Sequence, residues 1–186
     1  CRVVAGCVGV MLTHLTAGEV GGDAAAAARR LELAPVVGEA LQLTNILLDW
    51  PVDVRAGRCH LPADWLAAAG LAPAQLVGPP HPGVEGLSRR LEALARAALA
   101  QVPDYVELVS LRALRYRLFV LLPALWALAS LEHARHDPDF PRGTRPRLPR
   151  GRLWLEAARG LPGRHGAALA RLRAAASSPA LAGQRG

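Results

Sequence analysis

The stretch LQLTNILLDWPVDVRAGRCHLP, residues 41–62, decides the fold class. Gln42, Asn45, Asp49 and Asp53 recur in it at the spacing of a helical turn and fall within an arc of roughly 80° on an α-helix. The other positions are mostly apolar, and a helix that is apolar over most of its circumference is normally buried. A carboxylate on a buried helix must be paired, protonated or bound to a metal, since an isolated buried charge is too costly. The stretch predicts a core helix with one acidic stripe.

The composition of the whole chain favours the same fold class. The 186 residues are long enough to bury one substantial core, and only 4% of them are aromatic. Short proline and glycine breaks separate long apolar-periodic runs, and no alternating strand pattern occurs. We therefore expect an all-α protein. The three cysteines lack C-x-x-C spacing, so neither a disulfide framework nor a zinc site is indicated, and a reducing, cytoplasmic compartment is expected.

The positive charge of the chain is concentrated in its last quarter. Residues 140–186 hold ten arginines and a single acid, Glu156, whereas the rest of the chain is slightly acidic. Such a segment could meet phosphate, anionic lipid or nucleic acid, or simply be a solvated tail. It lacks interleaved aromatic residues, so no nucleic-acid partner is predicted. The apolar run at 118–131 has the length of a buried core helix. Peripheral membrane contact remains an expectation.

Local signals predict where the helices begin and end. A first helix covers residues 1–17, where small residues permit close helix packing. Asp23 is a plausible N-cap, Pro35 is expected to open the helix that carries the acidic stripe, and Gly57 to close it. A further helix is expected from Pro103 onward, and Pro123 should kink or split it.

The remaining segments complete the expected organisation. Further helices are predicted at 61–70, 84–102, 151–160 and 166–176. The chain should divide into a helical core (1–135), an Arg/Pro-rich segment with short helices (136–176) and a flexible tail (177–186).

The acidic stripe suits a metal and a phosphate. Asn45, Asp49 and Asp53 place oxygen-bearing groups one turn apart, as Mg²⁺ prefers when it binds few carboxylates and substrate phosphate oxygens. Arg55 and Arg58 follow at once and are suited to bidentate phosphate contacts. Together these groups describe a site that grips a diphosphate and stabilises it as it leaves. The alternative is a solvated acid pair with Arg55 paired to Asp53.

Three segments carry a resemblance to a known family. GEALQLTNILLDWPVDVRAGRCHLP resembles the second aspartate-rich signature of the squalene and phytoene synthases. CRVVAGCVGVMLTHL is similar to the VAG segment of the same family, and RYRLFVLLPALWALASL to its helix with arginine, Leu-Phe and proline. RPRLPRGRLW is a weaker match to a basic segment. The resemblance covers about residues 1–160.

The resemblance implies an isoprenoid synthase-type helical bundle around an apolar tunnel, with its N-terminal helices missing here. It implies an enzyme that joins two prenyl diphosphates head to head with Mg²⁺. Asp49 and Asp53 would then be catalytic and, with Asn45, hold the metal. The substrate-binding residues that it implies are Gln42, Asn45, Arg55 and Arg58 for the diphosphate, and Val4, Ala5, Gly6, Phe119 and Pro123 for the tunnel.

The chain also departs from the family pattern. The other aspartate-rich motif is absent, so the chain holds half of a two-sided metal site and is expected to be inactive alone. Pro51 and Val52 stand where glycine and glutamate are usual, and Pro51 should bend the helix. Leu48 replaces an arginine associated with the phosphates of NADPH. If NADPH is used, Arg147 and Arg150 are the residues expected to contact it.

The competing interpretations differ in product. VAGxVGxMLT favours a squalene synthase that uses farnesyl diphosphate, and the alternative is a phytoene or dehydrosqualene synthase that needs no reductant. A non-catalytic assembly factor of the same fold is a third interpretation, against which the acids argue. Other candidates are expected to be structural or inert: His14, His60, His81, Cys59, Trp126 and Trp154.

Overall fold

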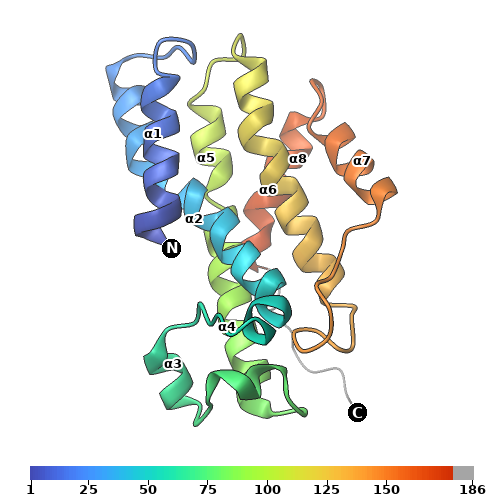
Figure 1. Cartoon of the computed structure of the whole chain (residues 1–186). Coiled ribbons are helices and arrows are strands. Elements are labelled where there is room, and N and C mark those ends of the chain that lie inside the picture. Colours follow the sequence, from blue (N-terminus) through green and yellow to red (C-terminus); the bar gives the residue numbers. More distant parts are fainter. Residues whose placement is uncertain (178–186) are drawn as a thin grey trace.

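The computed structural model describes residues 1–177, and these residues form helices without any strand (Figure 1). The prediction of an all-α fold is confirmed. The elements are η1 (Arg2–Gly6, a π-helical turn), α1 (Cys7–Leu15), α2 (Ala24–Arg55), α3 (Ala63–Ala68), η2 (Pro73–Val77, a 3₁₀ helix), α4 (Pro82–Leu99), α5 (Val102–Glu107), α6 (Leu114–Ala134), α7 (Arg150–Arg159), α8 (His165–Arg173) and η3 (Ala174–Ser177, a 3₁₀ helix).

The long helix α2 is the central element of the bundle. Its first half packs on η1 and α1, and its later turns pack on α4 and η2 (Figure 1). Trp50 is buried on the inner side of α2 and its Nε1 donates to the carbonyl oxygen of Leu76, 3.3 Å away. Both α2 and α6 are long and apolar enough to cross a membrane, but buried helices of soluble proteins meet the same criterion.

Helix α2 does not begin at Pro35, so that prediction is wrong. The helix runs without interruption from Ala24 through Pro35 and Pro51 to Arg55. Asp23 caps its first turn by accepting a hydrogen bond from the Ala26 amide at 2.8 Å, as expected. A proline inside a helix removes one backbone bond at a cost of about 3 kcal/mol. Packing on neighbouring helices along both halves of α2 offsets that local cost.

The end of α2 follows the prediction. Ala56 is its C-cap residue, and Gly57 takes a positive φ of 74°. Glycine adopts this left-handed conformation without the steric penalty of a side chain.

The helix expected from Pro103 onward is broken at residues 108–113 and not at Pro123, which lies inside α6. Buried arginines stabilise this break. Arg30 donates from Nη1 to the carbonyl oxygen of Leu108 at 2.7 Å, and Arg117 donates to that of Val109 at 2.5 Å. These side chains satisfy carbonyl groups that the helix end leaves unpaired. No property of the local sequence signalled the break, because the arginine side chains that stabilise it come from other helices.

The contact between the first helices and α2 is made through backbone. A Cβ atom added at Gly9 would overlap the carbonyl oxygen of Ala34, and one added at Gly38 would overlap that of Ala5. Both glycines are therefore required by the close approach of the two helices. The expectation that small residues in the first helix serve close packing is confirmed.

The short helices α7 and α8 form near their predicted positions and are attached to α6 through buried charge. Glu156 of α7 is fully buried, and it pairs with Arg152 at 3.0 Å, with Arg159 at 2.5 Å and with Arg171 of α8. Arg171 also pairs with Glu132 of α6 at 2.6 Å. Much of the arginine-rich segment is therefore part of the folded bundle. The division into a core and a separate segment stays a prediction, and the predicted tail lies almost entirely outside the described residues.

Candidate active site

The acidic stripe of α2 lies at the edge of the bundle and not in its interior. Asp49 and Asp53 have side chains that are 29% and 19% exposed, Gln42 is half-buried and Asn45 is exposed. The opposite side of α2, which includes Trp50, is buried in the core. The stripe is thus assembled on one helix face as predicted, but it is open to solvent.

Asp53 is held by residues that follow α2. Its Oδ1 accepts two hydrogen bonds from Arg58, one from Nη2 at 2.8 Å and one from Nε at 3.1 Å. Its Oδ2 lies 3.5 Å from Nε2 of His60. Arg58 is more than half exposed, so its guanidinium could turn from the carboxylate to an incoming anion.

Asp49 is held by a residue that the sequence did not assign to the site. Arg145, in the segment between α6 and α7, lies with Nη1 2.8 Å from Oδ1 of Asp49. Each of the two carboxylates therefore has its own arginine. These ion pairs compensate the negative charge of both carboxylates.

Arg55 anchors the segment that carries Arg145. Its guanidinium donates to the carbonyl oxygens of Arg142 at 2.5 Å and Gly143 at 2.6 Å. The structure therefore commits Arg55 to backbone and not to Asp53, which was the alternative weighed from the sequence. Arg147 and Arg150 lie further along this segment, are exposed, and make no ion pair among residues 1–177.

The residues on the stripe fit Mg²⁺ as one side of a site. Within the described part of the chain, no three His, Cys, Asp or Glu side chains cluster as a metal site. Asn45, Asp49 and Asp53 offer one amide and two carboxylates on one helix face. An ion that binds one or two carboxylates and completes its shell with water and phosphate oxygens matches this donor set.

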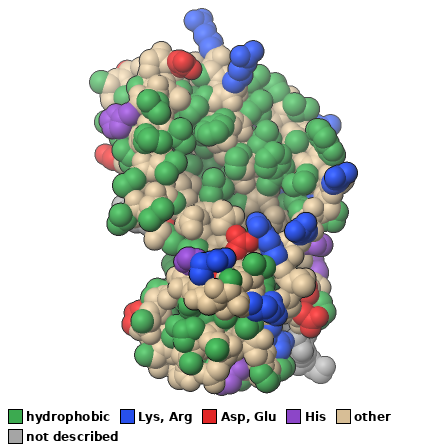
Figure 2. Space-filling model, viewed as in Figure 1, with side chains coloured by type: hydrophobic (Ala, Val, Ile, Leu, Met, Phe, Trp, Pro, Cys, Tyr) green, Lys and Arg blue, Asp and Glu red, His purple; other side chains and the backbone are tan. Residues whose placement is uncertain are grey.

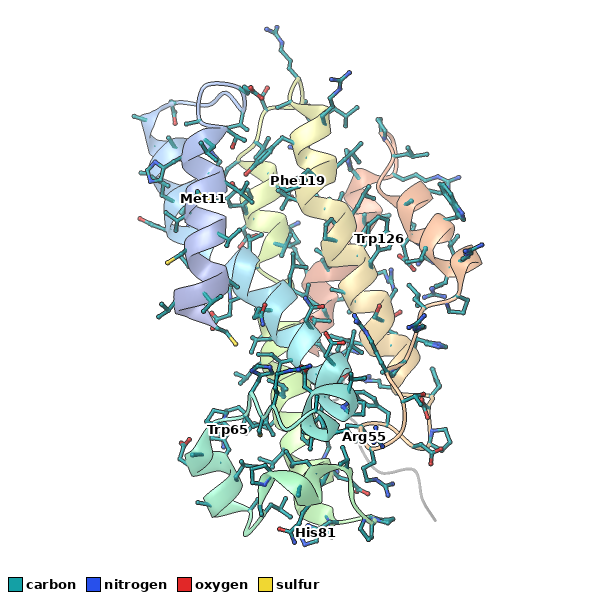
Figure 3. All side chains as sticks on the ribbon, in the orientation of Figure 1. Met11, Arg55, Trp65, His81, Phe119 and Trp126 are labelled. Carbon is teal, nitrogen blue, oxygen red and sulfur yellow. The ribbon has the colours of Figure 1, made fainter. Side chains whose placement is uncertain are left out.

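Exposed apolar side chains form a wall on η1, α1 and α6, and η1 and α1 pack on the helix that carries the stripe. Figure 2 shows hydrophobic side chains over the upper part of the molecule and charged ones across its middle. Figure 3 places Met11 on α1 and Phe119 on α6 in that upper part. The large exposed apolar residues of η1, α1 and α6 are Val3, Val4, Val8, Met11, Leu15 and Phe119, of which Val4 is 73% and Phe119 55% exposed. We call these residues the apolar wall.

The packing of η1 on α2 gives the offset between η1 and the first residues of the stripe. Ala5 meets α2 at Gly38, and Asn45 follows seven residues later, which is about 10 Å along a helix axis. The other residues assigned to the tunnel are less open. Gly6 is buried against Pro35, and Pro123 is half-buried within α6.

A chain of hydroxyl groups joins α1, α5 and α6, and sequence reasoning missed it. The hydroxyl of Tyr105 lies 2.7 Å from that of Thr13 and 2.7 Å from that of Tyr116. Burial raises the pKa of Tyr105 well above its ordinary value. Tyr116 also stacks on Phe119 of the wall, with 6.0 Å between ring centroids. The available signal was scarcity, because these are the two tyrosines of the chain.

Comparison with known proteins identifies the family. The sequence model of squalene/phytoene synthases matches residues 1–152, and the chain belongs to this family. It is 39% identical over 108 residues to the 15-cis-phytoene synthase of Enterobacter agglomerans, which covers 55% of this chain and 34% of that protein. It is 41% identical over 98 residues to the phytoene synthase of Thermus thermophilus, with 52% and 31% covered.

A further relative is the 15-cis-phytoene synthase of a Paracoccus species, 41% identical over 108 residues, with 54% of this chain and 32% of that protein covered. The matches thus span about a third of the length of these curated relatives. All three carry the name phytoene synthase. This name corresponds to the alternative given from the sequence and not to the preferred squalene synthase.

Proposed function

We propose that this chain supplies one aspartate face of an enzyme that joins two prenyl diphosphates head to head. We propose further that the enzyme is of the phytoene synthase type and needs no reductant. The supporting observation is the position of Asp49 and Asp53, which lie one turn apart on the solvent-facing side of α2, the helix on which η1 and α1 of the apolar wall pack. The names of the relatives support the choice of product type.

The two aspartates and their arginines would bind the diphosphate end of the substrate. Asn45, Asp49 and Asp53 would hold Mg²⁺, which when bound supplies positive charge against the departing diphosphate. The side chains of Arg58 and Arg145 are each about half exposed, so both can turn from carboxylate to phosphate oxygens. Binding would replace the ion pairs Arg58–Asp53 and Arg145–Asp49. The carboxylates would then contact the metal and the arginines would contact phosphate oxygens, so each charge would keep a partner of opposite sign.

The apolar wall would bind the prenyl chain. Val8, Met11 and Phe119 carry no hydroxyl, amine or carboxylate group that would hold water next to a carbocation. Apolar contact favours a long hydrocarbon chain over a short one, by about 25 cal/mol for each Å² removed from water. We therefore expect this face to bind the chain and to exclude water from the reacting carbons.

The reductant-dependent reaction is the second candidate. It would require the phosphates of NADPH to be bound close to the same face, and Leu48 is buried and cannot contact them. Arg147 and Arg150 are exposed and have no ion pair within residues 1–177, and the segment that carries them contacts α2 through Arg55. Their role as cofactor ligands remains a hypothesis.

One incubation distinguishes these candidates. The full-length protein is supplied with Mg²⁺ and with farnesyl or geranylgeranyl diphosphate, with and without NADPH, and the hydrocarbon is identified. A coupled hydrocarbon formed equally well without NADPH is the expected result. A saturating dependence on NADPH would replace the proposal by the squalene-type reaction. No hydrocarbon under any condition would reject both and favour the non-catalytic interpretation.

A further inference from the structure

Trp154 on α7 is the most exposed tryptophan of the described chain, which contradicts the expectation that it is a packing residue. Its side chain is 76% exposed. Trp126 of α6 behaves as expected, because its Nε1 donates to the carbonyl oxygen of Leu153 at 3.1 Å and so fastens α7 to the bundle. The contact turns one side of α7 inward and leaves Trp154 on the outer side.

The outer side of α7 is apolar. Leu155 is 44% exposed, and Leu161, just beyond the helix end, is 52% exposed. Leu161 lies beyond the C-cap residue Gly160, in the connection to α8, so it adds an exposed apolar side chain just past the end of the helix. The inner side carries the buried Glu156. An exposed tryptophan and leucine on a helix, with a further exposed leucine just beyond its end, are typical of segments that lie in a membrane interface.

The charge around this apolar side is positive. Residues 147–164 contain one acid, Glu156, and its charge is buried and neutralised by arginines. Arg147, Arg150 and Arg164 are exposed and make no hydrogen bond or ion pair through their side chains within residues 1–177. The free arginines therefore lie in sequence just before α7, at its first residue and just after it. Within residues 1–177 they are unpaired cations that flank the apolar side in sequence.

We propose that residues 147–164 dock on an anionic membrane surface. Trp154, Leu155 and Leu161 would enter the boundary between headgroups and acyl chains, and Arg147, Arg150 and Arg164 would meet lipid phosphates. A nucleic acid fits less well, because one tryptophan beside leucines gives no series of stacking platforms. This inference concerns a surface separate from the acidic stripe and does not depend on the proposed reaction.

Vesicle flotation with the full-length protein tests the proposal. Vesicles of phosphatidylcholine alone are compared with vesicles in which a third of the lipid is phosphatidylglycerol. We expect at least tenfold tighter binding to the anionic vesicles, weakened by salt. Replacing Arg150 and Arg164 by glutamine should lower this affinity about tenfold or more, since each arginine near an anionic surface adds to binding. The matched control is Arg112→Gln with Arg115→Gln, which removes the same charge from exposed positions elsewhere.

The apolar contribution is tested separately. Trp154→Ser with Leu161→Ser should abolish most binding, whereas Leu111→Ser, at a residue that is 77% exposed in the 108–113 connection, should not. Trp154→Phe should keep binding but lose the fluorescence quenching that brominated lipids cause in the parent protein. Melting temperatures of all variants should match the parent, because the changed side chains are exposed.

Equal binding of parent and both α7 variants would overturn the proposal. The proposal would also be overturned if the full-length protein bound RNA or another protein in a salt-sensitive way and showed no preference for anionic vesicles. Quenching that persists in Trp154→Phe would show that another part of the protein meets the membrane.

Discussion

Arg145 and Asp49 form an ion pair of 2.8 Å between segments that are far apart in the sequence. The pair lies at the surface, with about half of the Arg145 side chain exposed, so its contribution to stability is small, of the order of 0–1 kcal/mol. Its significance is positional. It brings a cation of the arginine-rich segment to the carboxylate proposed to bind metal, and it leaves no uncompensated repulsion between Asp49 and Asp53.

Asp49→Asn in the full-length enzyme should lower turnover by about 10²-fold or more, by analogy with the loss of other electrostatic groups that stabilise a leaving charge. The Mg²⁺ dependence of the rate is measured alongside, and the variant should need a higher Mg²⁺ concentration for its half-maximal rate. Melting temperature should change by no more than about 2–4 °C, because only a surface ion pair is lost.

Glu85→Gln, at an exposed acid in the first turn of α4, is the control for loss of a carboxylate elsewhere. Unchanged turnover and Mg²⁺ dependence in Asp49→Asn would remove Asp49 from the metal site.

Gly38→Ala should destabilise the protein by about 1–3 kcal/mol or more, because the added methyl group overlaps the carbonyl oxygen of Ala5 and forces α2 away from η1. Urea denaturation measures the free energy of unfolding. Gly86→Ala in α4 is the matched control, since nothing lies within 4 Å of its added Cβ. That variant should gain about 0.5–1 kcal/mol from helix propensity. If both variants shift in the same direction, the close helix contact is wrong.

Glu156→Ala should cost about 3 kcal/mol or more, because it removes a fully buried carboxylate and leaves Arg152, Arg159 and Arg171 without their shared partner. The loss should be visible as early melting of the α7–α8 region by hydrogen exchange. Glu32→Ala breaks an exposed pair with Arg29 and should change stability by less than about 0.5 kcal/mol. Similar effects of the two substitutions would show that the Glu156 cluster is not buried in solution.

His165 should make stability fall as pH falls. Burial, and secondarily the nearby Arg117 cation, lower the pKa of His165 below its ordinary value of 6.5. Between about pH 7 and 5.5 the unfolded chain therefore binds more protons than the folded one, so protonation favours unfolding. Urea midpoints across this range should show a smaller decline in His165→Gln than in the parent. His14→Gln controls for loss of an imidazole on another helix, and parallel declines in parent and His165→Gln would reject the assignment.

Residues close together in sequence determined which helix face carries the polar side chains and where helix α2 begins and ends. The spacing of Asn45, Asp49 and Asp53 predicted one helix face, and that face exists because helical periodicity is a local property. Asp23 and Gly57 marked helix ends correctly, since an N-cap bond and a left-handed C-terminal residue involve only neighbours. The small residues of the first helix likewise predicted close packing.

Only the tertiary structure decided which long-range partners each side chain has. It selected Arg145 for Asp49, directed Arg55 to the carbonyl oxygens of Arg142 and Gly143, and ended a helix at residue 107 by means of buried arginines from other elements. It also left the side chain of Trp154 exposed, although a packing role was expected for it. Sequence patterns report which groups can form a helix face or an ion pair. The choice among many arginines depends on where the packed core brings their guanidinium groups, and that is a property of the whole fold.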